Sequence, residues 1–193
     1  GIRCLMNARA GYSRQGNPFL TVTHIQDVLE DTFRQCPTLI LDGELYSHHL
    51  HDNFNAIVSL VKKTSRLTEA DLELARAQIE FWVFDVHVRG WDWTFAERQD
   101  FLRSLPIAWA YETPIKIIET VTCTTPEEID RHYEALLLER YEGQMIRLNG
   151  PYEESGEKER RSGNLLKRKP TNAEEFIIAA VNEGEGKCRN MAG

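Results

Sequence analysis

Charged residues stand at four places where the surrounding sequence is apolar enough to form buried strands. In chain order these places are Asp42-Gly43-Glu44 in TLILDGELYS, Phe84-Asp85 in IEFWVFDVHV, Glu142-Gly143 in EGQMIR, and Lys167 and Lys169 in LLKRKP. Because side chains alternate along a strand, Lys167 and Lys169 would share one face and Arg168 would take the other. Two ammonium groups on one face repel each other unless an anion lies between them, and a phosphate fits that role.

The carboxylates Glu44 and Glu142 adjoin apolar strands, where they would bind a hydroxyl group or a hydrated magnesium ion. Mg²⁺ prefers oxygen ligands and usually keeps several of its waters. Each signal has a plainer interpretation when taken alone: a solvated glutamate, the wet face of an edge strand, or a core position for Phe84. Only the joint order of the four places favours a phosphate and magnesium site.

Length and composition bound the possible classes of protein. The chain has 193 residues, 41% of them hydrophobic and 27% charged, which suffices for one good core. No apolar run reaches the about 18 residues of a membrane span, and no signal-peptide pattern is found. A net charge of −7 argues against a stand-alone nucleic-acid binder, although Lys158 to Lys169 is locally basic. The four cysteines are widely spaced, which favours reduced thiols in an intracellular protein.

The hydrophobic periodicity predicts strands that alternate with amphipathic helices. Helices are expected over residues 23–36, 54–64, 68–79, 94–105 and 125–140, and strands over 2–8, 38–47, 79–88, 115–123, 142–148, 165–170 and 174–186. Thr68 with Asp71, and Thr125 followed by Pro126, are typical of helix starts. This order favours an α+β class in which helices cover the sheets.

In order and spacing, the four places resemble the motifs of the covalent nucleotidyltransferase superfamily of ATP-dependent polynucleotide ligases and mRNA capping enzymes. The resemblance covers nearly the whole chain. The first motif of that family reads Lys-x-Asp-Gly-x-Arg, and Gly1-Ile2-Arg3 matches its end. The resemblance therefore implies a nucleophilic lysine three residues before Gly1. It also implies an ATP-grasp-like adenylation domain of antiparallel sheets flanked by helices over residues 1–170, lacking its N-terminal part, with the truncated beginning of an OB-fold domain over 171–193.

The resemblance also implies a role for each matching residue. In the family, the lysine attacks the α-phosphate of ATP, with Lys167 and Lys169 lowering its pKa and, together with Mg²⁺, neutralising the phosphate charge. Glu142 would be catalytic and associated with the metal. The remaining contacts to the nucleotide would come from Arg3 at its sugar and phosphate, Arg14 at the nucleotide or the nucleic-acid backbone, Glu44 at the ribose, and Phe84 stacked on the base.

Within the superfamily, EGQMIR and FDV are most similar to ATP-dependent DNA ligases. The sequence departs from common patterns at Arg147, where lysine is more frequent, and at Arg168, where many relatives carry an aromatic residue. RNA ligase, capping guanylyltransferase and a nucleotide-binding domain without catalysis remain alternatives. The resemblance implies ATP and nicked duplex DNA (or RNA) as partners, a monomer with no membrane association, and a place in DNA repair, replication or recombination. The expected location is intracellular, in the cytoplasm of a bacterium or a virus-infected cell.

Overall fold

A computed structural model describes the chain except for residues 110–111, 154–162, 172–174, 178, 184–188 and 190–193. Its main sheet has five strands in the order β2-β1-β3-β4-β5. The strands are β1 Ile2–Met6, β2 Gly11–Tyr12, β3 Leu39–Tyr46, β4 Glu80–Val88 and β5 Ile115–Ile117. Neighbouring strands are antiparallel from β2 to β4, and only β5 runs parallel to its neighbour. The expected α+β class with mainly antiparallel sheets is confirmed.

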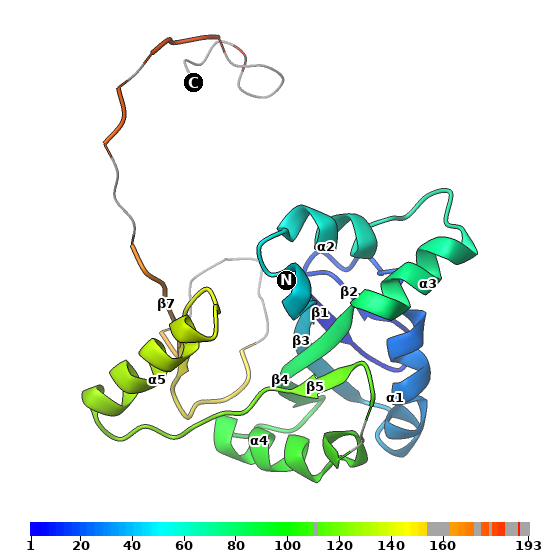
Figure 1. The fold of residues 1–193 in the computed structure, drawn as a ribbon. Helices are drawn as coiled ribbons and strands as arrows, with labels where there is room; N and C mark the ends of the chain where they lie inside the picture. The colour runs from blue at the N-terminus through cyan, green and yellow to red at the C-terminus, as the bar shows by residue number, and fades with distance from the viewer. Residues whose placement is uncertain (110–111, 154–162, 172–174, 178, 184–188, 190–193) are drawn as a thin grey trace.

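The two faces of this sheet differ in polarity. On one face, the fully buried Leu41, Leu45 and Phe81 join apolar residues of several helices in a single core. The helices around this part of the sheet are α1 Thr23–Gln35, α2 Phe54–Val61 and α3 Glu69–Gln78 (Figure 1). The short 3₁₀ helix η1 His48–Leu50 follows β3. The other face carries the charged residues of β1, β3 and β4, because side chains alternate along each strand.

The predicted helix starts are confirmed by their capping contacts. Thr68 Oγ1 accepts a hydrogen bond from the Asp71 backbone at 3.3 Å, and Asp71 accepts one from the Thr68 backbone at 2.8 Å. The same reciprocal pattern begins α4 Phe95–Ser104 and α5 Pro126–Leu138. Each such cap stabilises its helix by about 1 kcal/mol. The 3₁₀ helix η2 Pro106–Trp109 follows α4.

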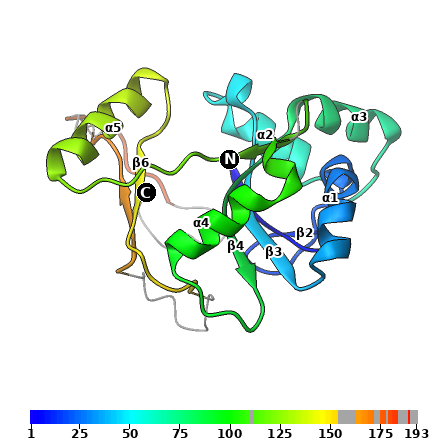
Figure 2. The same ribbon diagram turned by 90° about the horizontal axis from the view of Figure 1, so that it is seen from below.

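A smaller unit lies beside the main sheet, on the side away from α1. It consists of α5 and the antiparallel strands β6 Gln144–Arg147 and β7 Leu165–Arg168 (Figures 1 and 2). Arg168 faces α5, where its guanidinium bonds Asp130 at 2.6 Å and lies 4.1 Å from the ring centre of Tyr133. Gly150 and Tyr152, after β6, lead back to the main sheet through contacts described below.

Two predicted strands differ most from the structure. The strand expected over residues 115–123 ends at Ile117, because only its first three residues pair with β4. The strand expected over 174–186 is wrong for residues 175–177 and 179–182, which form no strand and leave Phe176 and Ile177 exposed. The rest of that segment, apart from Glu183, lies outside the described residues, as do Cys188 and residues 158–162 of the basic stretch that begins at Lys158.

Candidate active site

A β-bulge in the main sheet sets the geometry of the candidate site. Asp42 pairs with Asp85, whereas Gly43 pairs with Val83, so Phe84 is an extra residue on β4. A Cβ atom at Gly43 would lie 2.5 Å from the carbonyl oxygen of Trp82 and 2.6 Å from the ring of Phe81. Only glycine fits at this close approach, which explains the glycine in the Asp-Gly-Glu sequence.

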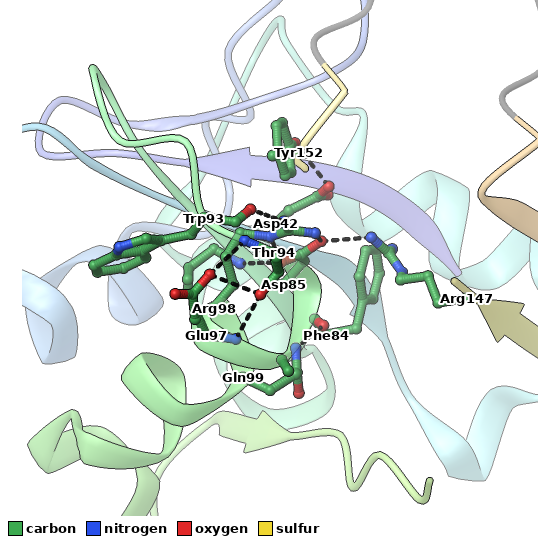
Figure 3. Close-up of polar contacts among 12 residues, drawn as sticks. Asp42, Phe84, Asp85, Trp93, Thr94, Glu97, Arg98, Gln99, Arg147 and Tyr152 are labelled. Atoms are coloured by element: carbon green, nitrogen blue, oxygen red, sulfur yellow. Dashed lines mark hydrogen bonds and ion pairs between the residues drawn. The ribbon is translucent and has the colours of Figure 1, made fainter. Parts of the chain in front are cut away.

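Asp85 is fully buried and is held by two arginines. Arg98 of α4 donates to its two oxygens at 2.8 and 3.1 Å, and Arg147 of β6 donates to Oδ2 at 2.5 Å (Figure 3). Arg98 also donates to the carbonyl oxygens of Trp93 and Gly150, at 2.7 and 3.0 Å. A buried charge is tolerated only when it is paired in this way. Asp85 therefore ties together β4, α4 and the smaller unit.

Asp42 forms a second buried ion pair next to Asp85. Its carboxylate, 1% exposed, accepts from Arg3 Nε at 2.9 Å and from Arg3 Nη2 at 2.6 Å. The hydroxyl of Tyr152 donates to Asp42 Oδ2 at 2.9 Å (Figure 3). Burial, followed by the Asp42 charge, raises the pKa of Tyr152, so this hydroxyl stays protonated as a donor. One edge of the Arg3 guanidinium is thus fixed by Asp42, which orients the side chain that was predicted to meet the nucleotide.

Phe84 lies half-buried on the polar face of the sheet, beside the two ion pairs. The Arg147 guanidinium lies 5.7 Å from the centre of its ring, and Gln99 Nε2 donates to its carbonyl oxygen at 2.9 Å. The bulge and these two contacts fix the ring outside the apolar core of the opposite face. Part of the Phe84 ring is exposed, and an exposed aromatic ring can stack on a planar ligand.

The predicted phosphate-binding residues Glu142, Lys167 and Lys169 lie together in the smaller unit. Lys169 forms an ion pair with Glu142, and this contact lowers the pKa of Glu142 and raises the pKa of Lys169. Burial, then the charge of Lys169, lowers the pKa of Lys167. Glu44 acts electrostatically on both lysines, and its Oε1 lies 3.6 Å from the nitrogen of Gly1. Lys167 and Lys169 share one face, as predicted from strand alternation.

Gly143 makes the close contact between β6 and β7 that brings Glu142 to the lysines. Its φ angle is +147°, and a Cβ atom there would lie 2.2 Å from the carbonyl oxygen of Arg168. No other residue fits this combination of backbone angle and space. The glycine after Glu142 therefore serves the pairing of the two strands.

Arg14 stands apart from the other predicted site residues. It is exposed in the turn after β2, where Gly16 donates to the carbonyl oxygen of Ser13 at 2.9 Å and has a φ angle of +77°. None of the hydrogen bonds and ion pairs among the described residues joins Arg14 to the rest of the site. The sequence also did not reveal Arg98 and Tyr152 as partners of the buried carboxylates. The helical spacing of Phe95, Arg98 and Leu102 places Arg98 on the inner face of α4, and this was the available signal.

The arrangement can bind an anion and a hydrated cation. Lys167 and Lys169 offer ammonium donors, and Glu44 and Glu142 offer carboxylate oxygens. The described residues contain no group of three or more metal-ligating side chains that is arranged to hold an ion. A cation at Glu142 would therefore complete its shell with water and phosphate oxygens, which is how Mg²⁺ commonly binds.

Comparisons with known proteins agree with this architecture. The chain matches the family described as "ATP dependent DNA ligase domain" over residues 6–169. It is 26% identical over 152 residues to a protein named "Probable DNA ligase" from Mycolicibacterium paratuberculosis (strain ATCC BAA-968 / K-10). That similarity covers 78% of this chain and 28% of the relative, so the chain spans little more than a quarter of that protein's length.

Two solved structures have similar folds. One is described as "DNA binding with a minimal scaffold: Structure-function analysis of Lig E DNA ligases", with 24% identity and a TM-score of 0.72 over 100% of this chain and 68% of the other. The second is described as "New Crystal Structure of Chlorella Virus DNA Ligase-Adenylate", with 22% identity and a TM-score of 0.61 over 88% of this chain and 58% of the other.

Mainly antiparallel sheets flanked by helices thus define an α+β domain, and this fold is shared with the two solved structures. Since the family match spans residues 6–169, the chain belongs to the ATP-dependent DNA ligase domain family. No helix in the described part of the chain is long and apolar enough to cross a membrane.

Proposed function

We propose that the chain is the nucleotide-binding part of the adenylation domain of an ATP-dependent DNA ligase. The observation that carries the proposal is the convergence of Glu142, Lys167 and Lys169 next to Glu44 and Gly1. In the proposed reaction, a lysine three residues before Gly1 attacks the α-phosphorus of ATP, and the bond to the pyrophosphate oxygen breaks. The AMP then passes to the 5′-phosphate of a nick, and the 3′-hydroxyl displaces it to form the phosphodiester bond.

Each residue of the site is proposed to have one role in the first step. Lys167 and Lys169 bind the phosphate, and their charge favours the neutral form of the attacking lysine. Glu142 holds Mg²⁺, which supplies positive charge at the phosphate oxygens when it is bound. Glu44 accepts from the ribose hydroxyls, Phe84 stacks on the base, and Arg3, oriented by Asp42, contacts the sugar and phosphate. Arg14, exposed on its turn, contacts the nucleotide or the DNA backbone.

The proposed partners are ATP and a nicked duplex, and the proposed assembly is a monomer. The lysines on the site face and the exposed Arg14 support contact with phosphates on one side of an otherwise acidic chain. We also propose that residues 171–193 begin an OB-fold domain, since Phe176 and Ile177 are exposed and available for packing. The intracellular location in a bacterium or a virus-infected cell stays a prediction.

The proposal is tested with the complete polypeptide that carries this chain, incubated with ATP labelled at the α-phosphate and Mg²⁺. We expect covalent AMP on the lysine before Gly1, and sealing of a nicked duplex. Glu142→Ala and Lys167→Ala should abolish labelling without lowering the thermal unfolding temperature. A wild-type polypeptide that binds ATP without covalent labelling would show a nucleotide-binding domain without catalysis. Labelling with GTP, or sealing of RNA alone, would identify one of the other two classes.

A further inference from the structure

Four rings form a continuous cluster between the main sheet and the smaller unit, and we name this cluster the aromatic bridge. Its members are Tyr46 at the end of β3, His48 of η1, Trp82 of β4, and Tyr141 between α5 and β6. Tyr141 lies 5.2 Å from His48 and 6.2 Å from Trp82 between ring centres. Tyr46 and His48 lie 4.9 and 6.3 Å from Trp82, respectively. These distances are typical of interacting aromatic pairs.

The bridge adjoins both carboxylates of the site. Trp82 is the direct partner of Glu44 across β3 and β4. Tyr141 immediately precedes Glu142 in the sequence. A displacement of the Tyr141 ring therefore moves the backbone that carries Glu142, and with it the position of Glu142 relative to Glu44.

The part of the bridge on the main sheet is held by hydrogen bonds. Trp82 Nε1 donates to Glu80 at 2.8 Å, and the Tyr46 hydroxyl lies 3.2 Å from His48 Nδ1. The ring of His51 stacks on His48 at 5.4 Å, and its Nδ1 lies 2.9 Å from the His48 carbonyl oxygen. The rings of the main sheet thus form a fixed platform on which the ring of Tyr141 rests.

The strand β6 is consequently anchored at both ends. Arg147, its last residue, bonds Asp85 in the main sheet, and Tyr141, three residues before its start, rests on the platform. Among the described residues, the Tyr141 hydroxyl makes no hydrogen bond, so the ring provides the contact. The backbone of Tyr141 donates to the Leu136 carbonyl oxygen at 3.0 Å, which also connects this anchor to α5.

We propose that Tyr141 is a positioning residue for the proposed adenylation reaction: its ring, resting on His48 and Trp82, sets the position of Glu142 relative to Glu44. This inference rests on the proposed function of the site. It assigns a role to the ring and none to the hydroxyl. The effect of losing the ring should appear mainly in the response to Mg²⁺, because Glu142 is the proposed metal ligand.

The test compares Tyr141→Ala, Tyr141→Phe and a control, Trp91→Ala, in the complete polypeptide. Trp91 is 49% exposed and stacks on Trp93 at 4.3 Å, so its removal deletes a similar contact outside the bridge. The rate of covalent AMP labelling is measured against Mg²⁺ and ATP concentration. Tyr141→Ala should raise the Mg²⁺ concentration for half-maximal rate by at least about threefold, because it removes the ring contacts with both His48 and Trp82. Tyr141→Phe and Trp91→Ala should leave that concentration unchanged.

Coupling between the two sides of the bridge provides a second measurement. His48→Ala should produce a shift of the same kind. The double variant should differ little from Tyr141→Ala alone, because both changes remove the same contact between His48 and Tyr141. An unchanged Mg²⁺ response in Tyr141→Ala would overturn the inference, as would equal effects of Tyr141→Phe and Tyr141→Ala. Should Tyr141→Ala fail to fold, Tyr141→Leu carries the same expectation. Absence of labelling in the wild type would instead refute the proposed function itself.

Discussion

Asp42 and Asp85 are direct partners across β3 and β4, and each buried carboxylate is matched by a bidentate arginine from another element. Two adjacent carboxylates repel each other, so both ion pairs are needed for the strands to lie side by side. Arg3 thereby connects β1 to the polar face of β3, and Arg98 connects α4 to the polar face of β4. The polar centre of this face is a structural support for the candidate site.

Asp85→Ala should destabilise the fold strongly. The change leaves Arg98, 3% exposed, without its carboxylate partner, and removal of one member of a buried ion pair costs about 3 to 5 kcal/mol. The free energy of unfolding in urea measures this loss. Asp31→Ala is the control, since its ion pair with Arg34 is exposed and should contribute no more than about 0.5 kcal/mol. Equal effects of both variants would show that the Asp85 contacts are unimportant for stability.

His24 should make stability depend on pH. Burial lowers the pKa of His24 below its ordinary value of 6.5, and the charge of Arg76 lowers it further. The hydrogen bond between Nε2 and the Ile79 carbonyl oxygen acts in the opposite direction and raises the pKa. As the pH falls below 6.5, the unfolded chain binds a proton that the folded chain does not, so stability decreases until the folded pKa is passed. Asp27 partly opposes this shift.

The pH effect of His24 is measured as the free energy of unfolding at about pH 8 and about pH 5. His24→Gln keeps a donor for the Ile79 carbonyl oxygen but does not titrate, so the difference between the two pH values should shrink. His49→Gln, at an exposed position, should leave the difference unchanged. A wild-type difference that persists in His24→Gln would assign the pH dependence to other groups.

Phe84→Ala should weaken ATP binding by about 1 to 3 kcal/mol, the range for loss of one base-stacking contact. The ring is half-buried on the polar face, so its removal should cost the fold less than truncation of Phe81, which is fully buried in the core. Calorimetric titration with ATP and thermal unfolding of both variants measure the two effects. Unfolding of Phe84→Ala at the temperature of Phe81→Ala, with unchanged ATP affinity, would show that Phe84 is only a core residue.

Local patterns in the sequence were sufficient for most of the fold. The capping pair Thr68 and Asp71 and the pair Thr125 and Pro126 act within one helical turn, so the sequence alone predicts where α3 and α5 begin. The end of β5 depends on a partner strand, and pairing with β4 stops after Ile117. The apolar pattern alone therefore predicts too long a strand here. It also predicts a strand for residues 175–177 and 179–182, which form none.

The candidate site was predictable to the extent that its residues stand in recognisable order. The shared face of Lys167 and Lys169 is predicted from strand alternation, and Lys169 forms an ion pair with Glu142, another of the candidate residues. The partners of the buried carboxylates were not predictable, because Tyr152 is 110 residues away from Asp42 in sequence. Such contacts depend on how the smaller unit rests on the main sheet, and no local pattern encodes that position.

Gly143→Ala should separate Glu142 from the lysines. At a φ angle of +147°, the new Cβ would meet the Arg168 carbonyl oxygen at 2.2 Å, so β6 and β7 must move apart. Backbone strain of this kind costs about 1 to 3 kcal/mol. Gly163→Ala is the matched control, because a Cβ at Gly163 meets no atom within 4 Å. The rate of covalent AMP labelling of the complete polypeptide should fall at least about tenfold in Gly143→Ala. The middle of that strain range, about 2 kcal/mol, corresponds to more than a tenfold change in rate. Labelling at the wild-type rate in both variants would show that the pairing at Gly143 does not position Glu142.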